Sequence, residues 1–252
     1  MAAPVAKSKS YWAATRAPRY SLVFVLPLFA LYESLAAALG GSASAVRNAA
    51  DIALKTPFLM LSGARGSLAF FATITAVCVY LVVRDVSRSK DRPRARTFAL
   101  MLGESVLLAL LLGIVVGTLT QRLLGAFTAL SIQAGTGNPL DGMSAATRLM
   151  LALGAGLYEE LLFRVLLVGG LASGLAWLTG SRGWMTGLVA AVVGALVFSA
   201  FHYVGEYGDT FTVASFTYRA IAGLAFSGLY LTRGFGITAW THALYDVYVM
   251  VL

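Results

Sequence analysis

Long, almost uninterrupted apolar runs constrain the fold of this chain more than any other feature of its sequence. Several of them reach the roughly 20 residues that a helix needs to cross about 30 Å of hydrocarbon. Unpaired backbone groups cost several kcal/mol each in lipid, and the runs lack the alternation of membrane-barrel strands. We therefore predict an all-α, polytopic transmembrane helical bundle with about seven spans, at residues 20–40, 65–84, 97–120, 149–176, 184–204, 211–231 and 235–251.

Composition and charge indicate a membrane protein and argue against nucleic-acid binding. The chain is 59% hydrophobic and 12% charged, with a mean hydropathy of +0.80, which is outside the range of soluble domains. Its net charge of +8 owes much to two basic segments, residues 7–19 and 84–96. The positive-inside rule places both segments in the cytoplasm. We expect a multi-pass protein of the cell membrane with a cytoplasmic N-terminus and a retained first span. The amino-acid composition is compatible with a protein of the bacterial inner membrane.

Ionisable residues inside apolar runs cost at least a few kcal/mol, so each one is a candidate functional residue. In "YEELLFR", residues 158–164, Glu160 and Arg164 stand four positions apart and can form an ion pair on one helix face. Glu159 points about 100° away on a helix of 3.6 residues per turn, so the guanidinium does not serve it equally. Glu159 can be a general base for water, or all three residues can form a structural polar clamp; these residues alone leave both readings open.

The only two histidines of the chain also stand in patterned positions. His202 ends an F-x-x-x-H pattern that begins at Phe198, and His242 precedes Asp246 by four residues. Phe198 can wall a pocket or orient the His202 ring, although a lone histidine at a helix end is more often an ordinary hydrogen-bonding residue. His242 and Asp246 can be a carboxylate-oriented imidazole or two metal ligands. Both histidines lie in apolar helices beside other polar groups, which favours a shared site.

Other features of the apolar segments indicate packing. Glu33, Glu104 and Arg219 are expected to make interhelical polar contacts, with Arg219 paired to an acidic residue. The glycine-rich segment 154–180 most simply permits close helix packing.

The three patterns together resemble those of a known family. E-E-x-x-x-R, F-x-x-x-H and H-x-x-x-N/D follow one another in the intramembrane CAAX-protease and bacteriocin-processing family, which includes the type II CAAX prenyl endopeptidases (Ras-converting enzyme) and the Abi proteins. The resemblance covers roughly residues 145–252. It implies a catalytic helical core (145–252), which follows a basic cytoplasmic N-terminus (1–19), expected from its charge, and N-terminal transmembrane helices and loops (20–144).

The resemblance implies an intramembrane endopeptidase. It would hydrolyse a peptide bond near the membrane-proximal or C-terminal end of a membrane-associated or lipidated protein, without a covalent intermediate. Glu159 would activate the water with help from His202, and His242 with Asp246 would stabilise the oxyanion. The supporting residues would be Glu160, Arg164 and Phe198. Because Asp246 stands where Asn is common, we expect it to orient His242, which then donates the hydrogen bond.

Three alternatives stay open at this point. A divalent metal such as zinc could be held by Glu159, His202, His242 and Asp246, but no HExxH helix supports it and we favour no cofactor. A transporter or proton channel would usually show repeated halves or broken helices, and neither is evident. A scaffold or immunity protein that sequesters a peptide would be favoured by loss of a motif residue, and none is missing. The predicted topology would open the site away from the cytosol.

Overall fold

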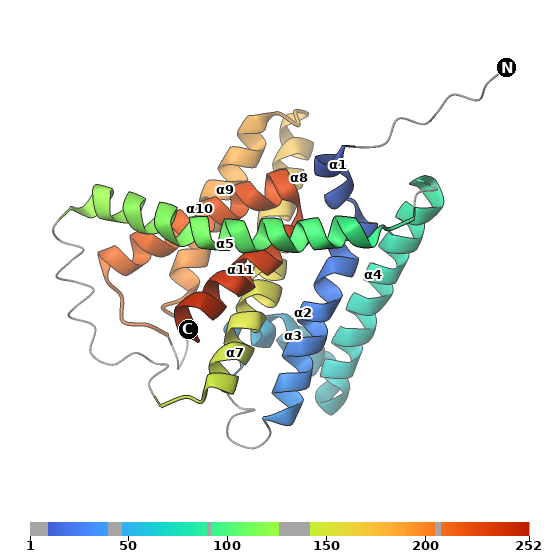
Figure 1. Cartoon of the computed structure of the whole chain (residues 1–252), viewed down its shortest axis with the longest axis horizontal. Helices are drawn as coiled ribbons and strands as arrows, with labels where there is room; N and C mark the ends of the chain where they lie inside the picture. The colour runs from blue at the N-terminus through green and yellow to red at the C-terminus, as the bar shows by residue number, and fades with distance from the viewer. Residues whose placement is uncertain (1–9, 40–46, 90–91, 126–141, 205–207, 252) are drawn as a thin grey trace.

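The computed structural model describes residues 10–39, 47–89, 92–125, 142–204 and 208–251. All regular elements among these residues are helices, which confirms the predicted all-α class. Figure 1 shows them in chain order: α1 (Tyr11–Thr15), α2 (Pro18–Ala38), α3 (Ala49–Ser62), η2 (Gly63–Arg65), α4 (Gly66–Ser89), α5 (Ala95–Leu124), α7 (Ala145–Gly154), η3 (Ala155–Val168), α8 (Gly169–Thr179), α9 (Trp184–Phe201), α10 (Val213–Arg233) and α11 (Phe235–Met250).

The predicted count of seven membrane spans is not confirmed. Within the described residues, five stretches are long and apolar enough to cross a membrane: Pro18–Ala38, Ala49–Ser89, Ala95–Leu124, Ala145–Thr179 and Trp184–Phe201. The last two predicted spans are helices, α10 and α11, but they do not meet these criteria. The 16 residues of α11 extend only about 24 Å at 1.5 Å per residue, less than the thickness of the hydrocarbon core.

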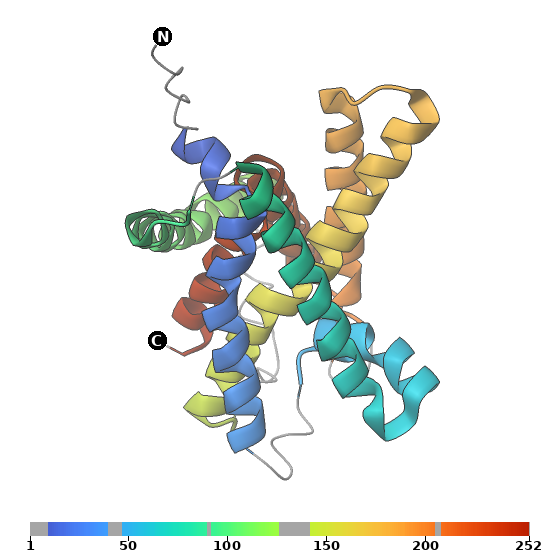
Figure 2. The ribbon, with the colours of Figure 1, turned by 90° about the vertical axis from the view of Figure 1, so that its right-hand side faces the viewer.

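One of the five stretches is a helical hairpin that the sequence did not predict. Gly63 has a φ of +56° and separates α3 from α4. A Cβ at Gly66 would lie 2.5 Å from the backbone of Leu59, so the turn requires glycine there. Figure 2 shows α3 folded back beside the lower part of α4. The hairpin brings the start of α3 toward η3, against which α3 packs.

Helix α11 occupies the centre of the bundle. It packs against η3, α5, α7, α2 and α10, and Figure 1 shows it in the middle of the molecule. Because α11 is surrounded by protein, it need not be long or uniformly apolar. Helices α4, α5 and α9 instead expose leucines and valines such as Leu68, Leu107 and Val192. Outward apolar faces of this kind fit contact with lipid.

The segment that carries "YEELLFR" is unusual in its backbone. Helix α7 continues into η3, and η3 continues into α8, without a break. The η3 segment has the wider hydrogen bonding of a π-helix. Insertions of π-helix are rare and occur frequently at functional sites. Glycine lets η3 approach α11 closely, because a Cβ at Gly156 would lie 2.5 Å from both the carbonyl oxygen of Ala239 and the Cβ of Ala243. The expectation of close packing in segment 154–180 is met at Gly156.

The two basic segments meet at one end of the bundle. The guanidinium of Arg19 lies 3.0 Å from the carboxylate of Asp85, and the backbone N–H of Arg94 donates to the hydroxyl of Tyr20 at 3.1 Å. The start of α2 therefore lies beside the link between α4 and α5, as a shared membrane face requires. Residues 7–9 and 90–91 of the basic segments lie outside the described residues.

Candidate active site

Glu160 is the centre of a buried ion-pair network. Its Oε2 lies 3.2 Å from Nε of Arg164, so the predicted pair forms within η3. Its Oε1 accepts a 2.7 Å hydrogen bond from Nδ1 of His242 on α11. Glu160 is fully buried and Arg164 is 1% exposed, so each charge depends on its partner. The network joins two helices that are far apart in sequence.

Aromatic rings pack around Arg164 and His242 of this network. The Arg164 guanidinium lies 4.2 Å from the ring centroid of Phe198 and 5.3 Å from that of Phe226, which allows cation–π contacts with both. The His242 ring stacks on Phe226 at 4.2 Å. Phe198 thus contacts the Arg164 guanidinium, and its supporting role in the site stays a prediction. Phe226 on α10 was not predicted, because an isolated phenylalanine in an apolar helix carries no sequence signal.

His202 follows the last residue of α9, and its ring is oriented by the start of its own motif. Its Nδ1 lies 2.8 Å from the carbonyl oxygen of Phe198, which can only accept, so Nδ1 carries the hydrogen. The Phe198 ring also contacts the imidazole edge to face, at 4.8 Å between centroids. This tautomer leaves Nε2 of the neutral ring as the atom that can accept a proton.

Glu159 has a hydrogen-bond partner that the sequence analysis missed. The side-chain amide of Asn48 donates to its Oε1 at 2.8 Å, and both residues are only 9% exposed. The two histidines lie near the same ring, since the Phe198 centroid is 4.8 Å from that of His202 and 6.3 Å from that of His242, and Glu160, the neighbour of Glu159, bonds to His242. Asn48 is the N-cap of α3, and an asparagine just before an apolar segment is a sequence feature that indicates a helix start. Its contact with Glu159 had no signal in the sequence.

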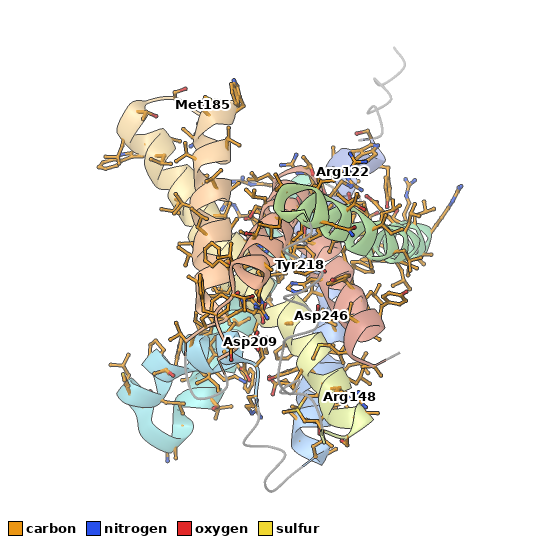
Figure 3. All side chains as sticks on the ribbon, turned by 90° about the vertical axis from the view of Figure 1, so that its left-hand side faces the viewer. Arg122, Arg148, Met185, Asp209, Tyr218 and Asp246 are labelled. Carbon is orange, nitrogen blue, oxygen red and sulfur yellow. The ribbon has the colours of Figure 1, made fainter. Side chains whose placement is uncertain are left out.

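Asp246 lies at the edge of this cluster. Its Oδ2 is 3.5 Å from Nε2 of His242, longer than the contact of Glu160 with the other ring nitrogen. Glu160 therefore holds the His242 ring more directly than Asp246, the residue expected to orient it. Figure 3 shows Asp246 near the middle of the molecule, with Tyr218 above it and Arg148 below. The Tyr218 hydroxyl contacts that of Tyr245, the neighbour of Asp246.

The arrangement of donors does not fit a divalent metal. No three Asp, Glu, His or Cys side chains among the described ranges come close enough together to hold one ion. The Nδ1 atoms of His202 and His242 are directed to Phe198 and Glu160. A metal-free site stays a prediction.

Glu33 belongs to a second polar network, next to the site. Its Oε1 accepts a 2.5 Å hydrogen bond from the hydroxyl of Tyr158 and lies 3.2 Å from Nζ of Lys55. Lys55 also pairs with Asp51 at 2.5 Å, and the Tyr32 hydroxyl donates to Asp51 at 2.7 Å. Glu33 thus makes the expected interhelical contacts, here between α2, α3 and η3.

The two remaining membrane charges are also paired. Glu104 on α5 forms a two-pronged ion pair with Arg233, with contacts of 2.5 Å and 2.7 Å, and accepts a hydrogen bond from Tyr11. Arg219 pairs with Asp209 and donates to the Tyr203 hydroxyl at 3.1 Å. The prediction that Arg219 pairs with an acidic residue is confirmed.

Comparison with known proteins agrees with the motif pattern. Residues 142–248 match the family model described as Type II CAAX prenyl endopeptidase Rce1-like. The match covers less than half of the chain, and residues 142–248, the Rce1-like region, are similar to that family. No curated protein and no solved structure gives a significant match to the chain.

The similarity of this region to the Rce1-like family supports a membrane-embedded protease. The Rce1-like region contains Glu159, His202, His242 and Asp246, whereas Asn48 lies outside it. The predicted division into segments 1–19, 20–144 and 145–252 stays a prediction. In the fold itself, the N-terminal helices pack on α11 and contribute a partner to Glu159.

Proposed function

We propose that this protein is an intramembrane endopeptidase that cleaves a membrane-associated or lipidated protein near its membrane-proximal or C-terminal end. The observation that carries the proposal is the convergence of η3, the end of α9 and α11 within the Rce1-like region: the Phe198 ring lies 4.8 Å from the His202 ring and 6.3 Å from the His242 ring, between centroids, and His242 hydrogen-bonds to Glu160, the neighbour of Glu159. Paired carboxylate and imidazole groups in a secluded site are suited to the activation of water.

In the proposed reaction, Glu159 and Nε2 of His202 orient a water molecule, and Glu159 accepts its proton as the oxygen attacks the peptide carbonyl. The C–N bond then breaks, and the proton passes to the departing amine. His242 has a carboxylate at each ring nitrogen, Glu160 at 2.7 Å and Asp246 at 3.5 Å, an arrangement that stabilises the cationic imidazole. The cation can donate from Nε2 to the developing oxyanion, which is electrostatic stabilisation of the transition state.

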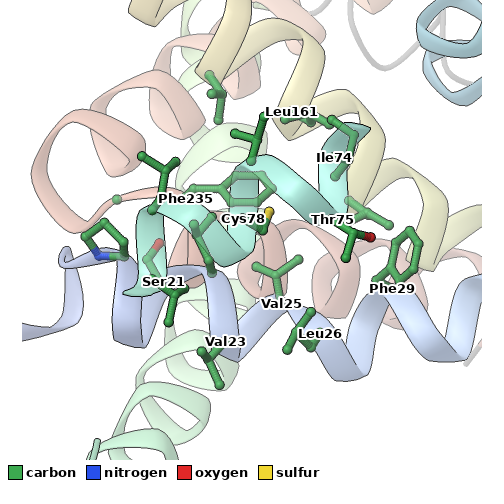
Figure 4. A pocket seen from close by; sticks show the side chains of 18 of the residues that line it. Ser21, Val23, Val25, Leu26, Phe29, Ile74, Thr75, Cys78, Leu161 and Phe235 are labelled. Carbon is green, nitrogen blue, oxygen red and sulfur yellow. The ribbon is translucent and has the colours of Figure 1, made fainter. Parts of the chain in front are cut away.

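An apolar cavity supports a lipidated substrate. It has a volume of about 640 Å³, within the range of small-molecule sites, and lies between α2, α4, η3 and the start of α11. Figure 4 shows Val25, Phe29, Ile74, Cys78 and Leu161 turned toward it. Leu157 and Tyr158, which precede Glu159, also line it. A hydrocarbon chain in this cavity would hold the attached peptide next to the candidate base.

The membrane face of the site follows from the basic segments. The cytoplasmic face is assigned to Arg19 and the link between α4 and α5, and Asn48 lies near Tyr32, in the half of α2 farther from Arg19. The Glu159 carboxylate accepts a hydrogen bond from Asn48, so we propose that the site opens on the membrane face opposite to the cytosol. Such a site suits translocated or lipid-anchored proteins.

The decisive experiment compares protein termini in membranes from cells that carry either the wild-type protein or the Glu159→Gln variant at matched abundance. New termini near the membrane-proximal ends of exported or lipidated proteins, found only with the wild-type protein, are the expected result. Identical termini with a well-folded variant would contradict proteolysis and favour transport or peptide sequestration.

A further inference from the structure

Asn48 uses both ends of its amide. Its Nδ2 donates to Oε1 of Glu159 at 2.8 Å, and its Oδ1 accepts from the backbone N–H groups of Ala50 at 2.9 Å and Asp51 at 3.4 Å. The side chain therefore caps α3 and contacts the candidate base at once. Rotation of the amide would leave a buried donor or acceptor without a partner, which is costly. Its orientation is thus fixed by the start of α3.

Helix α3 is in turn fixed to η3 at the residue next to Glu159. The Tyr158 hydroxyl donates to Glu33, and Lys55 on α3 lies 3.2 Å from Glu33 and 2.5 Å from Asp51. Lys55 is 5% exposed and its ammonium lies 5.1 Å from the Tyr158 ring centroid. Neighbouring residues of η3 are therefore tied to α3 by separate contacts, so Asn48 meets Glu159 from a rigid support.

We propose that Asn48 is a positioning residue for Glu159, a role that rests on the proposed function. A carboxylate in a cavity can turn about its terminal bond and present either oxygen to water. The amide of Asn48 engages Oε1, so Oε2 is the oxygen that accepts the proton. Pre-orientation of this kind raises the rate of the chemical step because the reacting groups already stand in the productive geometry.

Two substitutions separate this role from helix capping. Asn48→Ser and Asn48→Asp both keep a good N-cap acceptor for α3 and remove the amide donor. Thr56→Ala is the matched control on α3, since the exposed Thr56 hydroxyl bonds only to the backbone of Ile52 among the contacts of the described chain. The assay uses the purified full chain in nanodiscs and a fluorogenic peptide with a geranylgeranylated cysteine near its free C-terminus.

We expect kcat to fall about 10- to 100-fold in both Asn48 variants, the usual effect of losing a hydrogen bond to a charged group, with KM close to that of the wild-type protein. The melting temperature should be unchanged in Asn48→Ser and lower in Asn48→Asp, which places a second carboxylate beside Glu159. In a Glu159→Gln background, Asn48→Ser should cause no further loss of residual activity. Thr56→Ala should match the wild-type protein throughout.

Three outcomes would overturn the positioning role. A wild-type kcat in Asn48→Ser, while Glu159→Gln is inactive, would remove it and leave the proposed function intact. A fall in kcat that tracks a fall in melting temperature in both Asn48 variants would assign Asn48 a structural role only. If the wild-type protein cleaves neither the peptide nor any membrane protein, the proposed function fails and the positioning role fails with it.

Discussion

Nδ1 of His242 donates a 2.7 Å hydrogen bond to Glu160, although 82 positions separate the two residues in the chain. The contact separates the roles of the two adjacent glutamates. Glu160 is engaged by Arg164 and His242 and has no exposed surface, whereas Glu159 retains 9% exposure and bonds to a neutral amide. Glu160 joins two helices, and Glu159 is the carboxylate that we propose as the base.

Glu159→Gln should abolish most peptide hydrolysis and leave the fold intact. Glutamine keeps the size of the side chain but cannot accept a proton from water, and general-base catalysis typically contributes about 10²- to 10⁴-fold. The measurement is kcat on the geranylgeranylated peptide together with the melting temperature in detergent. Residual kcat above about one tenth of the wild-type value would show that Glu159 is not the base.

Glu160→Gln should act mainly on stability. It leaves the buried Arg164 guanidinium without its counter-charge, and breaking a buried pair in this way typically costs about 3–5 kcal/mol. We expect a clearly lower melting temperature and lower abundance in membranes, in contrast to Glu159→Gln. Equal melting temperatures for the two variants would argue against the division of roles.

Gly156→Ala should separate η3 from α11. The added Cβ would meet backbone and side-chain atoms of Ala239 and Ala243 at 2.5 Å, and overpacking of this kind typically costs about 1–3 kcal/mol. Because the Glu160–His242 contact crosses the same interface, activity should fall with stability. Gly170→Ala is the matched control, since no neighbouring atom lies within 4 Å of its Cβ position. A wild-type-like Gly156→Ala protein would show that the interface tolerates a wider spacing.

Cys78→Trp should weaken lipidated substrates selectively. The indole would fill part of the apolar cavity, so we expect KM for the geranylgeranylated peptide to rise at least about tenfold, as loss of a buried apolar contact implies, with a smaller change in kcat. Val115→Trp on the exposed face of α5, outside the cavity, serves as the control. An unchanged KM in Cys78→Trp would place the lipid elsewhere.

Chelation should leave the enzyme active. The described donors do not converge on an ion position, so EDTA or 1,10-phenanthroline should leave kcat within about twofold of the untreated value. A twofold change is small, since about 1.36 kcal/mol of activation free energy changes a rate tenfold. The metal content of the purified protein is measured in parallel. Loss of activity that is restored by zinc alone would contradict the metal-free mechanism.

The sequence predicted the helical class, and the spacing of its polar residues indicated candidates for the site, because both depend on local patterns. Apolar runs specify helices in lipid wherever they occur, and Glu160 with Arg164 follows from the four-residue spacing alone. The count of spans was not confirmed. Helix α11 is packed against other helices, so neither its length nor its hydropathy has to match the bilayer. Helix α3 was missed because its 14 residues are too few for a span.

The sequence by itself thus determined which chemical groups this protein carries into the membrane and in which order. Only the tertiary structure decided their partners: Asn48 for Glu159, His242 for Glu160 and Phe226 for both Arg164 and His242. These contacts join residues far apart in the chain, and they form where helices meet at a distance set by packing, as at Gly156. Spacing along one helix contains no information about which other helix will face it.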